Sequence, residues 1–231
     1  MNRADDHPTI AGLRLRWREV EEPGGGGAFG LWVPEDPDQL LDQITQEEFE
    51  RNDERMPYFG AVWPSAEALA ARLLAGAPLA GKRVLDLGCG LGACGFAAAR
   101  RGAEVVFMDW EPRAIEIVAA SALEQGLPLS TFDLVVADWR RPPRIHAFDL
   151  ILGADVLYEE RNAPAVAAFL AAHLQAGAEG WIGDPKRPHA LRFPALAREA
   201  GLEYLGGELL PRPAGGTEVS LLRFRRPAPP A

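Results

Sequence analysis

The 231-residue chain contains few of the residues that build metal sites or disulfide frameworks, and its 24 basic residues are outnumbered by 33 acidic ones. Its two cysteines and four histidines do not occur at the spacing of a metal site or a disulfide framework, so we expect no bound metal. The formal net charge of −9 argues against general affinity for nucleic acid or anionic membranes, because their phosphates would be repelled. Serine-elbow and P-loop lysine motifs are absent, which leaves hydrolase and phosphoryl-transfer functions without support.

Long apolar runs are also missing. No run approaches the roughly 18 residues that a membrane-spanning helix needs, and the first residues lack the apolar stretch of a signal peptide. We therefore expect a cytoplasmic protein. Hydrophobic residues make up 48% of the chain, enough to fill a sizeable core, and the length fits one α/β domain with an N-terminal extension.

The expected division is an N-terminal extension at residues 1–56, with a strand pair and an acidic helical segment, followed by a larger unit at residues 57–231. Alternating apolar residues at 13–17 and 29–33 predict a hairpin or paired edge strands, with a flexible glycine run between them. Residues 35–55 carry nine acids against two arginines. Such a run is typical of a solvated helix face, or less often of a surface that attracts a basic partner.

In the larger unit, strands and helices alternate, which predicts an α/β fold with a mostly parallel sheet covered by helices on both faces. Ser65 is the expected N-cap of the first helix, whose leucines 69, 73 and 74 share one face. The last two strands are expected to form an antiparallel edge pair. In chain order we expect a helix at 65–74, strand 83–87, helix 93–101, strand 104–109, helix 113–125, strands 132–137 and 150–153, helix 163–174, and strands 180–183, 202–205 and 218–224.

The turn after the first core strand is the most informative segment. Asp86 precedes three glycines at alternate positions, Gly88, Gly90 and Gly92, which let the backbone approach a ligand and turn into a helix. A carboxylate two residues before this turn would repel a pyrophosphate, whereas S-adenosylmethionine has no phosphate and carries an ammonium and a sulfonium. Asp86 therefore favours S-adenosylmethionine over a dinucleotide, as does Ala93 in place of a third fingerprint glycine.

Two further strand ends supply groups for an adenosine. Asp109 lies 19 residues beyond Gly90, where an acid can accept both ribose hydroxyls, or it could instead cap the helix that follows Pro112. Asp138 could accept a hydrogen bond from the adenine amine, and Trp139 could pack against the ring. The alternative is a turn acid beside an ordinary packed tryptophan.

The fourth core strand places Asp155 and Tyr158 at the same edge of the sheet. Methyl transfer is an in-line displacement, so the protein chiefly holds the nucleophile in line with the sulfonium and excludes water. A carboxylate can orient an arriving ammonium, and a tyrosine can narrow the pocket or hydrogen-bond the amine. Alternatively, Asp155 only satisfies loop amides and Tyr158 is a core ring with its hydroxyl at the surface.

Taken together, these motifs resemble the donor-binding motifs of class I S-adenosylmethionine-dependent methyltransferases over roughly residues 60–185. The resemblance implies a Rossmann-like, doubly wound sheet of seven strands with the last one antiparallel, and S-adenosylmethionine as the cofactor. It implies that Asp86, Gly88 and Gly90 line the methionine portion of the donor. The other donor-binding residues that it implies are Asp109, Trp110, Asp138, Trp139 and Ala154.

Three segments also resemble the protein-lysine methyltransferase branch that includes the electron-transfer-flavoprotein β-subunit lysine methyltransferase. They are the Asp-x-x-Tyr pattern at 155–158, the Trp-containing segment from residue 59, and the Gly-Asp-Pro turn at 183–185. The resemblance implies Trp63 beside the donor, and Asp155 and Tyr158 beside the amine of a protein lysine. The Asn-Pro-Pro-Tyr motif typical of methyltransferases acting on amide or nucleobase nitrogen is absent.

Two other functions remain open from the sequence. A small-molecule amine or hydroxyl would use the same donor site, and the acid-rich residues 35–55 would suit a small cation as well as a basic protein. A non-catalytic binding module would retain the fold, but it has no need of both the glycine turn and the Asp155–Tyr158 pair.

Overall fold

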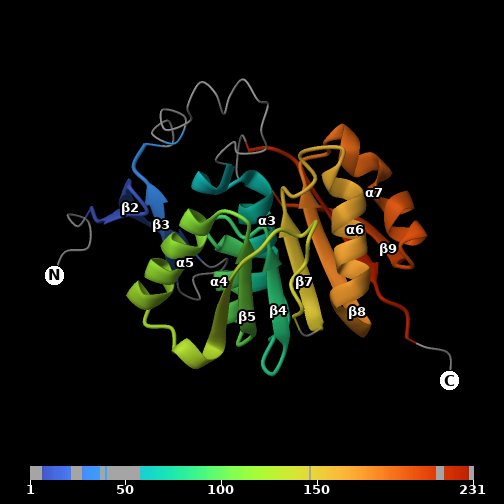
Figure 1. Ribbon diagram of the computed structural model, residues 1–231, viewed down its shortest axis with the longest axis horizontal. Coiled ribbons are helices and arrows are strands. Elements are labelled where there is room, and N and C mark those ends of the chain that lie inside the picture. Colours follow the sequence, from blue (N-terminus) through green and yellow to red (C-terminus); the bar gives the residue numbers. More distant parts are fainter. Residues whose placement is uncertain are drawn as a thin grey trace.

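The computed structural model describes residues 7–21, 28–36, 40, 58–145, 147–211 and 216–228. Within these residues, a seven-stranded sheet carries helices on both faces, and a three-stranded sheet formed by the N-terminal residues lies at one side (Figure 1). The strands of the larger sheet are β4 (Arg83–Leu87), β5 (Glu104–Asp109), β6 (Phe132–Val136), β7 (Phe148–Ala154), β8 (Leu174–Asp184), β9 (Glu203–Leu210) and β10 (Val219–Arg225). The helices around it are α3 (Pro64–Leu74), α4 (Ala93–Arg100), α5 (Pro112–Glu124), α6 (Asn162–His173) and α7 (Pro188–Glu199).

The order of the larger sheet is β6-β5-β4-β7-β8-β10-β9. Neighbouring strands from β6 to β8 are parallel, and β10 runs antiparallel to both β8 and β9. This confirms the expected mostly parallel, seven-stranded sheet with an antiparallel edge pair. Because β4 pairs with β5 on one side and β7 on the other, the topological switch point lies beside β4, where ligands bind at the carboxyl ends of the strands.

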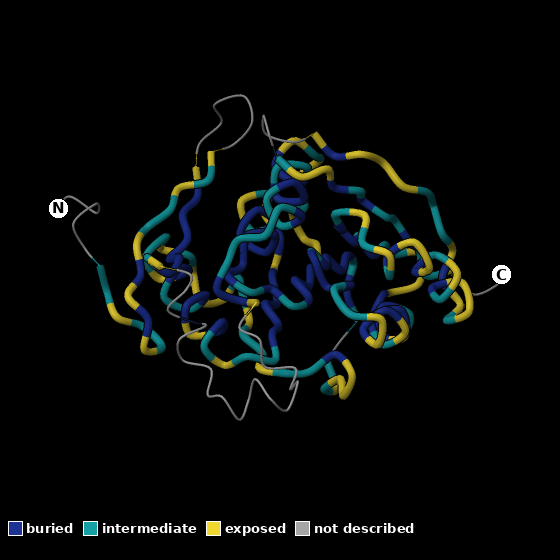
Figure 2. The backbone as a smooth tube through the Cα atoms, turned by 90° about the horizontal axis from the view of Figure 1, so that it is seen from above, coloured by how far each residue is buried: buried dark blue, intermediate teal, exposed yellow. Residues whose placement is uncertain are grey.

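The two faces of the sheet bury separate hydrophobic clusters. Successive strand residues point to opposite faces, so Val84 and Leu150 pack with α3, α4 and α5, whereas Leu85 and Ile151 pack with α6 and α7. The buried residues follow the strands through the middle of the molecule, and the exposed ones lie toward its outside (Figure 2). Burial on both faces explains why the strands read as continuous apolar runs.

The N-terminal strands β1 (Thr9–Ile10), β2 (Leu13–Glu21) and β3 (Ala28–Pro34) form the small sheet, and β2 pairs antiparallel with β3. This confirms the expected hairpin. Leu15 and Leu31 belong to the same hydrophobic cluster as α4 and α5, and the Trp32 backbone N–H donates to Ser121 Oγ of α5 at 2.9 Å. The hairpin thus adds an outer layer on the α4–α5 face. The glycine run and most of the acid-rich stretch lie outside the described residues, and the division at residue 56 remains a prediction.

The start of α3 differs from the expectation. Trp63, not Ser65, is the N-cap residue, and its own side chain makes no capping hydrogen bond. Pro64 occupies the first turn, where its fixed φ suits the helix and its missing N–H costs nothing. The Ser65 backbone N–H donates instead to Asp155 Oδ2 at 3.0 Å. Leu69, Leu73 and Leu74 are buried together as expected.

Other elements also differ from the sequence-based expectation, among them strand β9, which extends to Leu210, beyond the predicted 202–205. Helix α7 was not predicted, because Pro188 and Pro194 interrupt its pattern. Strand β8 is longer than the predicted 180–183 and begins directly after α6, at Leu174. None of the described helices is long and apolar enough to cross a membrane.

Candidate active site

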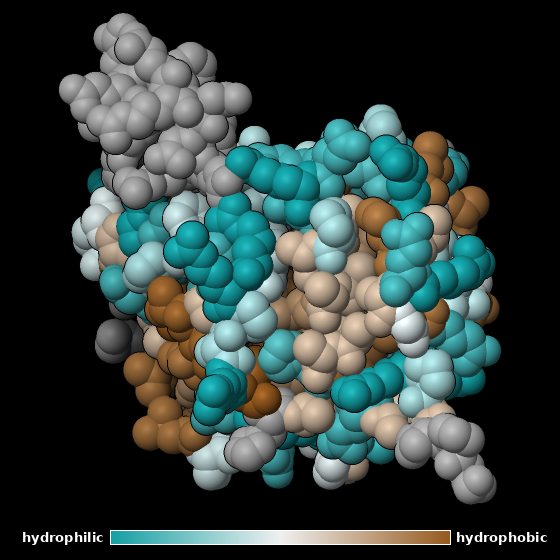
Figure 3. Space-filling model, turned by 45° about the vertical axis from the view of Figure 1, so that its right-hand side comes forward, coloured by the Kyte–Doolittle hydropathy of each residue, from teal (hydrophilic) through white to brown (hydrophobic). Residues whose placement is uncertain are grey.

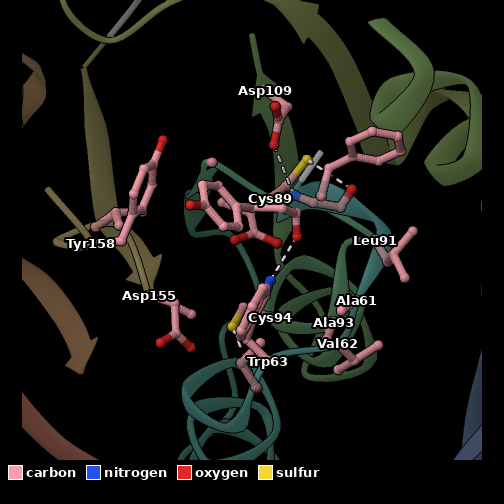
Figure 4. Close-up of a pocket in the computed structure, with 18 of the residues that line it drawn as sticks. Ala61, Val62, Trp63, Cys89, Leu91, Ala93, Cys94, Asp109, Asp155 and Tyr158 are labelled. Carbon is pink, nitrogen blue, oxygen red and sulfur yellow. Dashed lines mark hydrogen bonds between the residues drawn. The ribbon is translucent and has the colours of Figure 1, made fainter. Parts of the chain in front are cut away.

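A pocket of about 290 Å³ lies at the carboxyl ends of β4, β5 and β7. Side chains from these strand ends and from the start of α3 face it, including Asp109, Asp155, Tyr158 and Trp63 (Figure 4). The residues predicted from the sequence that line it are Trp63, Asp86, Gly88, Gly90, Asp109, Trp110, Trp139, Ala154, Asp155 and Tyr158. The structure thus brings the predicted donor and acceptor residues to one cavity, apart from Asp138.

The turn between β4 and α4 forms part of the pocket wall through its backbone. Gly88, Gly90 and Gly92 have φ values of 64°, 51° and 83°, a region that residues with a side chain rarely adopt. A Cβ at Gly88 would lie 2.7 Å from the Trp139 ring, and one at Gly90 would lie 3.4 Å from the Phe59 carbonyl oxygen. The turn therefore requires glycine for its backbone angles, and at Gly88 for the seating of Trp139.

Asp86 is almost fully buried beneath this turn, with 2% of its surface exposed. Its Oδ2 accepts a hydrogen bond from the Gly95 backbone N–H in α4 at 2.7 Å. Burial raises the pKa of Asp86 to about 7, although the hydrogen bond from Gly95 acts in the opposite direction. A cation bound nearby would favour the charged carboxylate. Asp86 can therefore release a proton when a positively charged ligand enters the pocket.

Asp109 connects the end of β5 to the glycine turn. Its Oδ2 accepts from the Gly90 backbone N–H at 2.9 Å, and its Oδ1 accepts from the Glu111 backbone N–H at 3.0 Å. Burial raises its pKa to about 6. Glu111 is the N-cap of α5, so the alternative in which Asp109 caps that helix is wrong. Each oxygen of Asp109 can accept a second hydrogen bond, as a ribose hydroxyl would require.

Trp139 and Asp138 have different surroundings. The Trp139 ring is buried in the pocket wall, and its Nε1–H has no hydrogen-bond partner among the described residues. Asp138 lies outside the residues that line the pocket and pairs with Arg140, whose Nη2 is 2.7 Å from Asp138 Oδ2. Burial acts to raise the pKa of Asp138, but the hydrogen bonds from Arg140 outweigh it and hold that pKa below its ordinary value. Its contact with adenine remains a prediction.

Asp155 directly follows β7, with a φ of 60°, and is buried. Its Oδ2 accepts from the Ser65 backbone N–H, and its Oδ1 accepts from Arg187 Nη1 at 2.6 Å. Arg187 lines the same pocket and also pairs with Asp184, whose Oδ2 is 3.3 Å from Nη1. Burial raises the pKa of Asp184 even though Arg187 acts to lower it.

Sequence reasoning missed Arg187 as a member of the site. The available signal was its position two residues after the Gly-Asp-Pro turn, at the carboxyl end of β8 and therefore at the same edge of the sheet as Asp155. It also missed that Asp155 satisfies the first turn of α3, because Ser65 and Asp155 are 90 residues apart in the chain.

Three aromatic residues cluster at one side of the pocket. The Tyr58 ring centroid, in the short 3-10 helix η2 (Tyr58–Gly60), lies 6.0 Å from that of Trp63 and 5.1 Å from that of Tyr158. Trp63 Nε1 donates to the Tyr58 carbonyl oxygen at 2.6 Å. Burial raises the pKa of Tyr158 to about 12, so its hydroxyl stays protonated at neutral pH and can donate a hydrogen bond. Tyr58, which sequence reasoning did not single out, is 40% exposed and marks the rim.

The sequence matches a family profile described as "Methyltransferase domain" over residues 84–177. It is 36% identical over 136 residues to the electron transfer flavoprotein beta subunit lysine methyltransferase of Danio rerio, covering 57% of this chain and 51% of that protein. It is 35% identical over 130 residues to the protein N-lysine methyltransferase METTL21A of Danio rerio, covering 53% of this chain and 58% of that protein. The alignments span 51% and 58% of the lengths of these two relatives.

Solved structures share the fold. The crystal structure of magnesium protoporphyrin IX methyltransferase from Synechocystis PCC 6803 with bound S-adenosylmethionine has a TM-score of 0.58 and 20% sequence identity. The match covers 83% of this chain and 90% of that chain. At this level of identity, the likeness concerns the arrangement of helices and strands.

Proposed function

Because the chain belongs to the class I S-adenosylmethionine-dependent methyltransferases, we propose that it transfers a methyl group from this cofactor to the side-chain amine of a protein lysine. The catalytic unit in this proposal is residues 57–231. The observation that carries the proposal is the arrangement of the pocket, which joins a donor half at Asp86 and Asp109 to an acidic half at Asp155. The cytoplasmic location expected from the sequence remains a prediction.

The donor half fits S-adenosylmethionine in charge and shape. Asp86 offers a carboxylate to the cationic methionine end, and the glycine turn lets the backbone come close to it. Asp109 retains acceptor capacity for the ribose hydroxyls, and the Trp139 ring lines the pocket where the adenine can pack against it. Trp63, Trp110 and Ala154 complete the wall of the donor half. The proposal also keeps Asp138 as the residue that accepts a hydrogen bond from the adenine amine. When bound, the cofactor supplies an electrophilic methyl group on a sulfonium.

The acceptor half fits an amine. Asp155 provides negative charge that can hold the arriving ammonium. The Tyr158 hydroxyl can accept a hydrogen bond from that ammonium or donate one to the neutral amine. The rings of Tyr58, Trp63 and Tyr158 give the pocket an aromatic side, against which the methylene chain of a lysine can pack. The amine loses its proton to water or a nearby base. Its lone pair would then bond to the methyl carbon in line while the sulfur–methyl bond breaks and S-adenosylhomocysteine leaves. The two lysine-methylating relatives, at 35% and 36% identity, favour a protein acceptor over a small molecule.

The test is transfer of tritiated methyl groups from S-adenosylmethionine to a cell lysate that is afterwards separated by size. We expect label in one or a few protein bands, and Nε-methylated lysine after acid hydrolysis. The Asp155→Asn variant should lose most of this labelling. Asp133→Asn is the matched control, because it makes the same chemical change at an exposed position of β6. Label confined to the low-mass fraction would instead indicate a small-molecule acceptor, and donor binding without any transfer would indicate a binding module.

A further inference from the structure

Arg187 is the one basic side chain among the described residues that line the pocket. Its Nη1 lies 2.6 Å from Asp155 Oδ1 and 3.3 Å from Asp184 Oδ2. Its backbone N–H also donates to Asp184 Oδ1 at 2.7 Å, which anchors the residue at both ends. Asp155, Asp184 and Arg187 therefore form a fixed triad at the acceptor end, and the side-chain exposures of the two acids are only 7% and 1%.

The charges of this triad leave room for one further cation. Two carboxylates and one guanidinium carry one excess negative charge, in a buried setting where an unbalanced charge is costly. Asp155 Oδ1 already accepts from Arg187 and its Oδ2 from the Ser65 amide, but each oxygen has a second lone pair. An acceptor ammonium can thus bind Asp155 while Arg187 stays in place.

We propose, building on the proposed amine acceptor, that Arg187 is a positioning residue that shares the Asp155 carboxylate with the acceptor amine, so that the amine binds less tightly as an ammonium and becomes a neutral nucleophile at lower pH. The physical reason is the positive charge that Arg187 holds against the same carboxylate, 2.6 Å from Asp155 Oδ1. An unshared carboxylate would stabilise the ammonium, which cannot attack the methyl group, whereas a second cation on the same carboxylate offsets that stabilisation.

The other titratable groups around Asp155 do not supply this positive charge. Cys94 on α4 and Cys89 in the glycine turn stay neutral, because burial raises the pKa of both thiols well above the ordinary value. Tyr158 also stays neutral near pH 7. The remaining titratable groups that line the pocket are Tyr58, Asp86, Asp109 and Glu111, and none of them is basic.

The test uses two donor-site ligands, so it does not depend on knowing the acceptor. S-adenosylhomocysteine lacks a charge at sulfur, whereas sinefungin carries a primary ammonium where the transferred methyl group would stand. The ratio of their affinities, measured by calorimetry from pH 6 to pH 10, therefore reports how the acceptor end receives an ammonium. Arg187→Gln should raise the preference for sinefungin about tenfold and shift the pH at which sinefungin binding weakens upward by about one unit.

Two further variants and one control complete the experiment. Arg187→Lys retains the charge and should stay within about twofold of the unmodified protein, whereas Asp155→Asn should lower the preference for sinefungin. Affinity for S-adenosylhomocysteine should stay the same throughout, which shows that the donor half is intact. The inference would be overturned by an unchanged ratio of sinefungin to S-adenosylhomocysteine affinity in Arg187→Gln or in Asp155→Asn. An equal loss of affinity for both ligands would also overturn it, as would the same ratio in Arg187→Lys as in Arg187→Gln.

The outcomes also separate this inference from the proposed function. If no lysine is methylated in a lysate but the sinefungin ratio responds as described, the triad receives an ammonium and the acceptor class is what must change. If lysine is methylated but the ratio does not respond, Arg187 has only a structural role.

Discussion

The contacts of Asp155 are compatible with both of the roles that sequence reasoning treated as alternatives. One carboxylate oxygen satisfies the Ser65 amide at the start of α3, and the other faces Arg187 in the pocket. Orienting an amine and satisfying backbone amides are therefore compatible, because each oxygen can accept more than one hydrogen bond. The residue was predictable from its strand end and its Asp-x-x-Tyr pattern. Its partners were not, because they come from residues 32 and 90 positions away in the chain.

Asp86 makes donor affinity sensitive to pH. Its pKa is raised to about 7 by burial, so below neutrality the pocket holds a protonated acid that a cationic donor must ionise. Between about pH 6 and 7.5 we expect the affinity for S-adenosylmethionine to rise on the order of tenfold, with release of a proton. Calorimetry in buffers of different ionisation enthalpy measures both quantities.

The matched variant for this prediction is Asp86→Asn. It should bind the donor more weakly and lose most of the pH dependence, because an amide does not titrate in this range. If the variant kept the slope of the unmodified protein, the proton would belong to another group, and Asp109, whose pKa burial raises to about 6, would be the next to replace.

At the scale of helices and strands, local pattern was informative where the core is regular. Strand β4 and helices α4 and α5 lie close to the residue ranges predicted from the apolar runs and glycines. The local pattern was misleading where a contact with a distant part of the chain replaced the expected local hydrogen bond. Serine is a residue type that often caps helices, but here Pro64 occupies the first turn and the Ser65 amide donates to Asp155. Helix α7 carries a proline at its start and another inside it, so its sequence lacks a regular helical pattern and no helix was predicted there.

The glycine turn between β4 and α4 is the element whose change should affect the donor site most. Gly88→Ala adds a Cβ that meets the Trp139 ring at 2.7 Å and also strains a φ of 64°. We expect a loss of about 2 kcal/mol in unfolding free energy and a fall in donor affinity of at least roughly tenfold. Denaturant unfolding and calorimetry with S-adenosylhomocysteine check the two effects.

Gly126→Ala is the control for backbone strain alone. Gly126 has a φ of 67°, but nothing lies within 4 Å of an added Cβ. It should lose about 1 kcal/mol or less and bind the donor normally. Equal donor affinities in the two variants would show that the contact between Gly88 and Trp139 does not shape the donor site.

For the whole molecule, the core is built on both faces of the sheet, and the N-terminal hairpin joins the cluster around α4 and α5. On the surface drawn in Figure 3, hydrophobic side chains occur in separate groups with hydrophilic ones between them. Within this packed interior, burying the charged carboxylates of the pocket lowers the free energy of unfolding. Asp86 and Asp109 both have a pKa raised by burial, which makes global stability depend on pH.

The sign of that dependence follows from proton binding. Between about pH 4 and 7 the folded protein retains protons on Asp86 and Asp109 that the unfolded chain has already released. Their contribution to stability is therefore greatest at low pH and is lost as the pH rises through about 6 and 7. Denaturant unfolding across this range should show a smaller decline for Asp86→Asn than for the unmodified protein. An identical slope would contradict the assignment of this effect to Asp86.

The most direct test is a crystal structure with S-adenosylhomocysteine bound. We expect the ribose hydroxyls on Asp109, the adenine against Trp139, the amino-acid end beside Asp86, and the sulfur facing an opening bordered by Asp155, Tyr158 and Arg187. A ribose away from Asp109, or a sulfur that faces a wall with no passage to the surface near Tyr58, would contradict a donor site that serves a protein lysine.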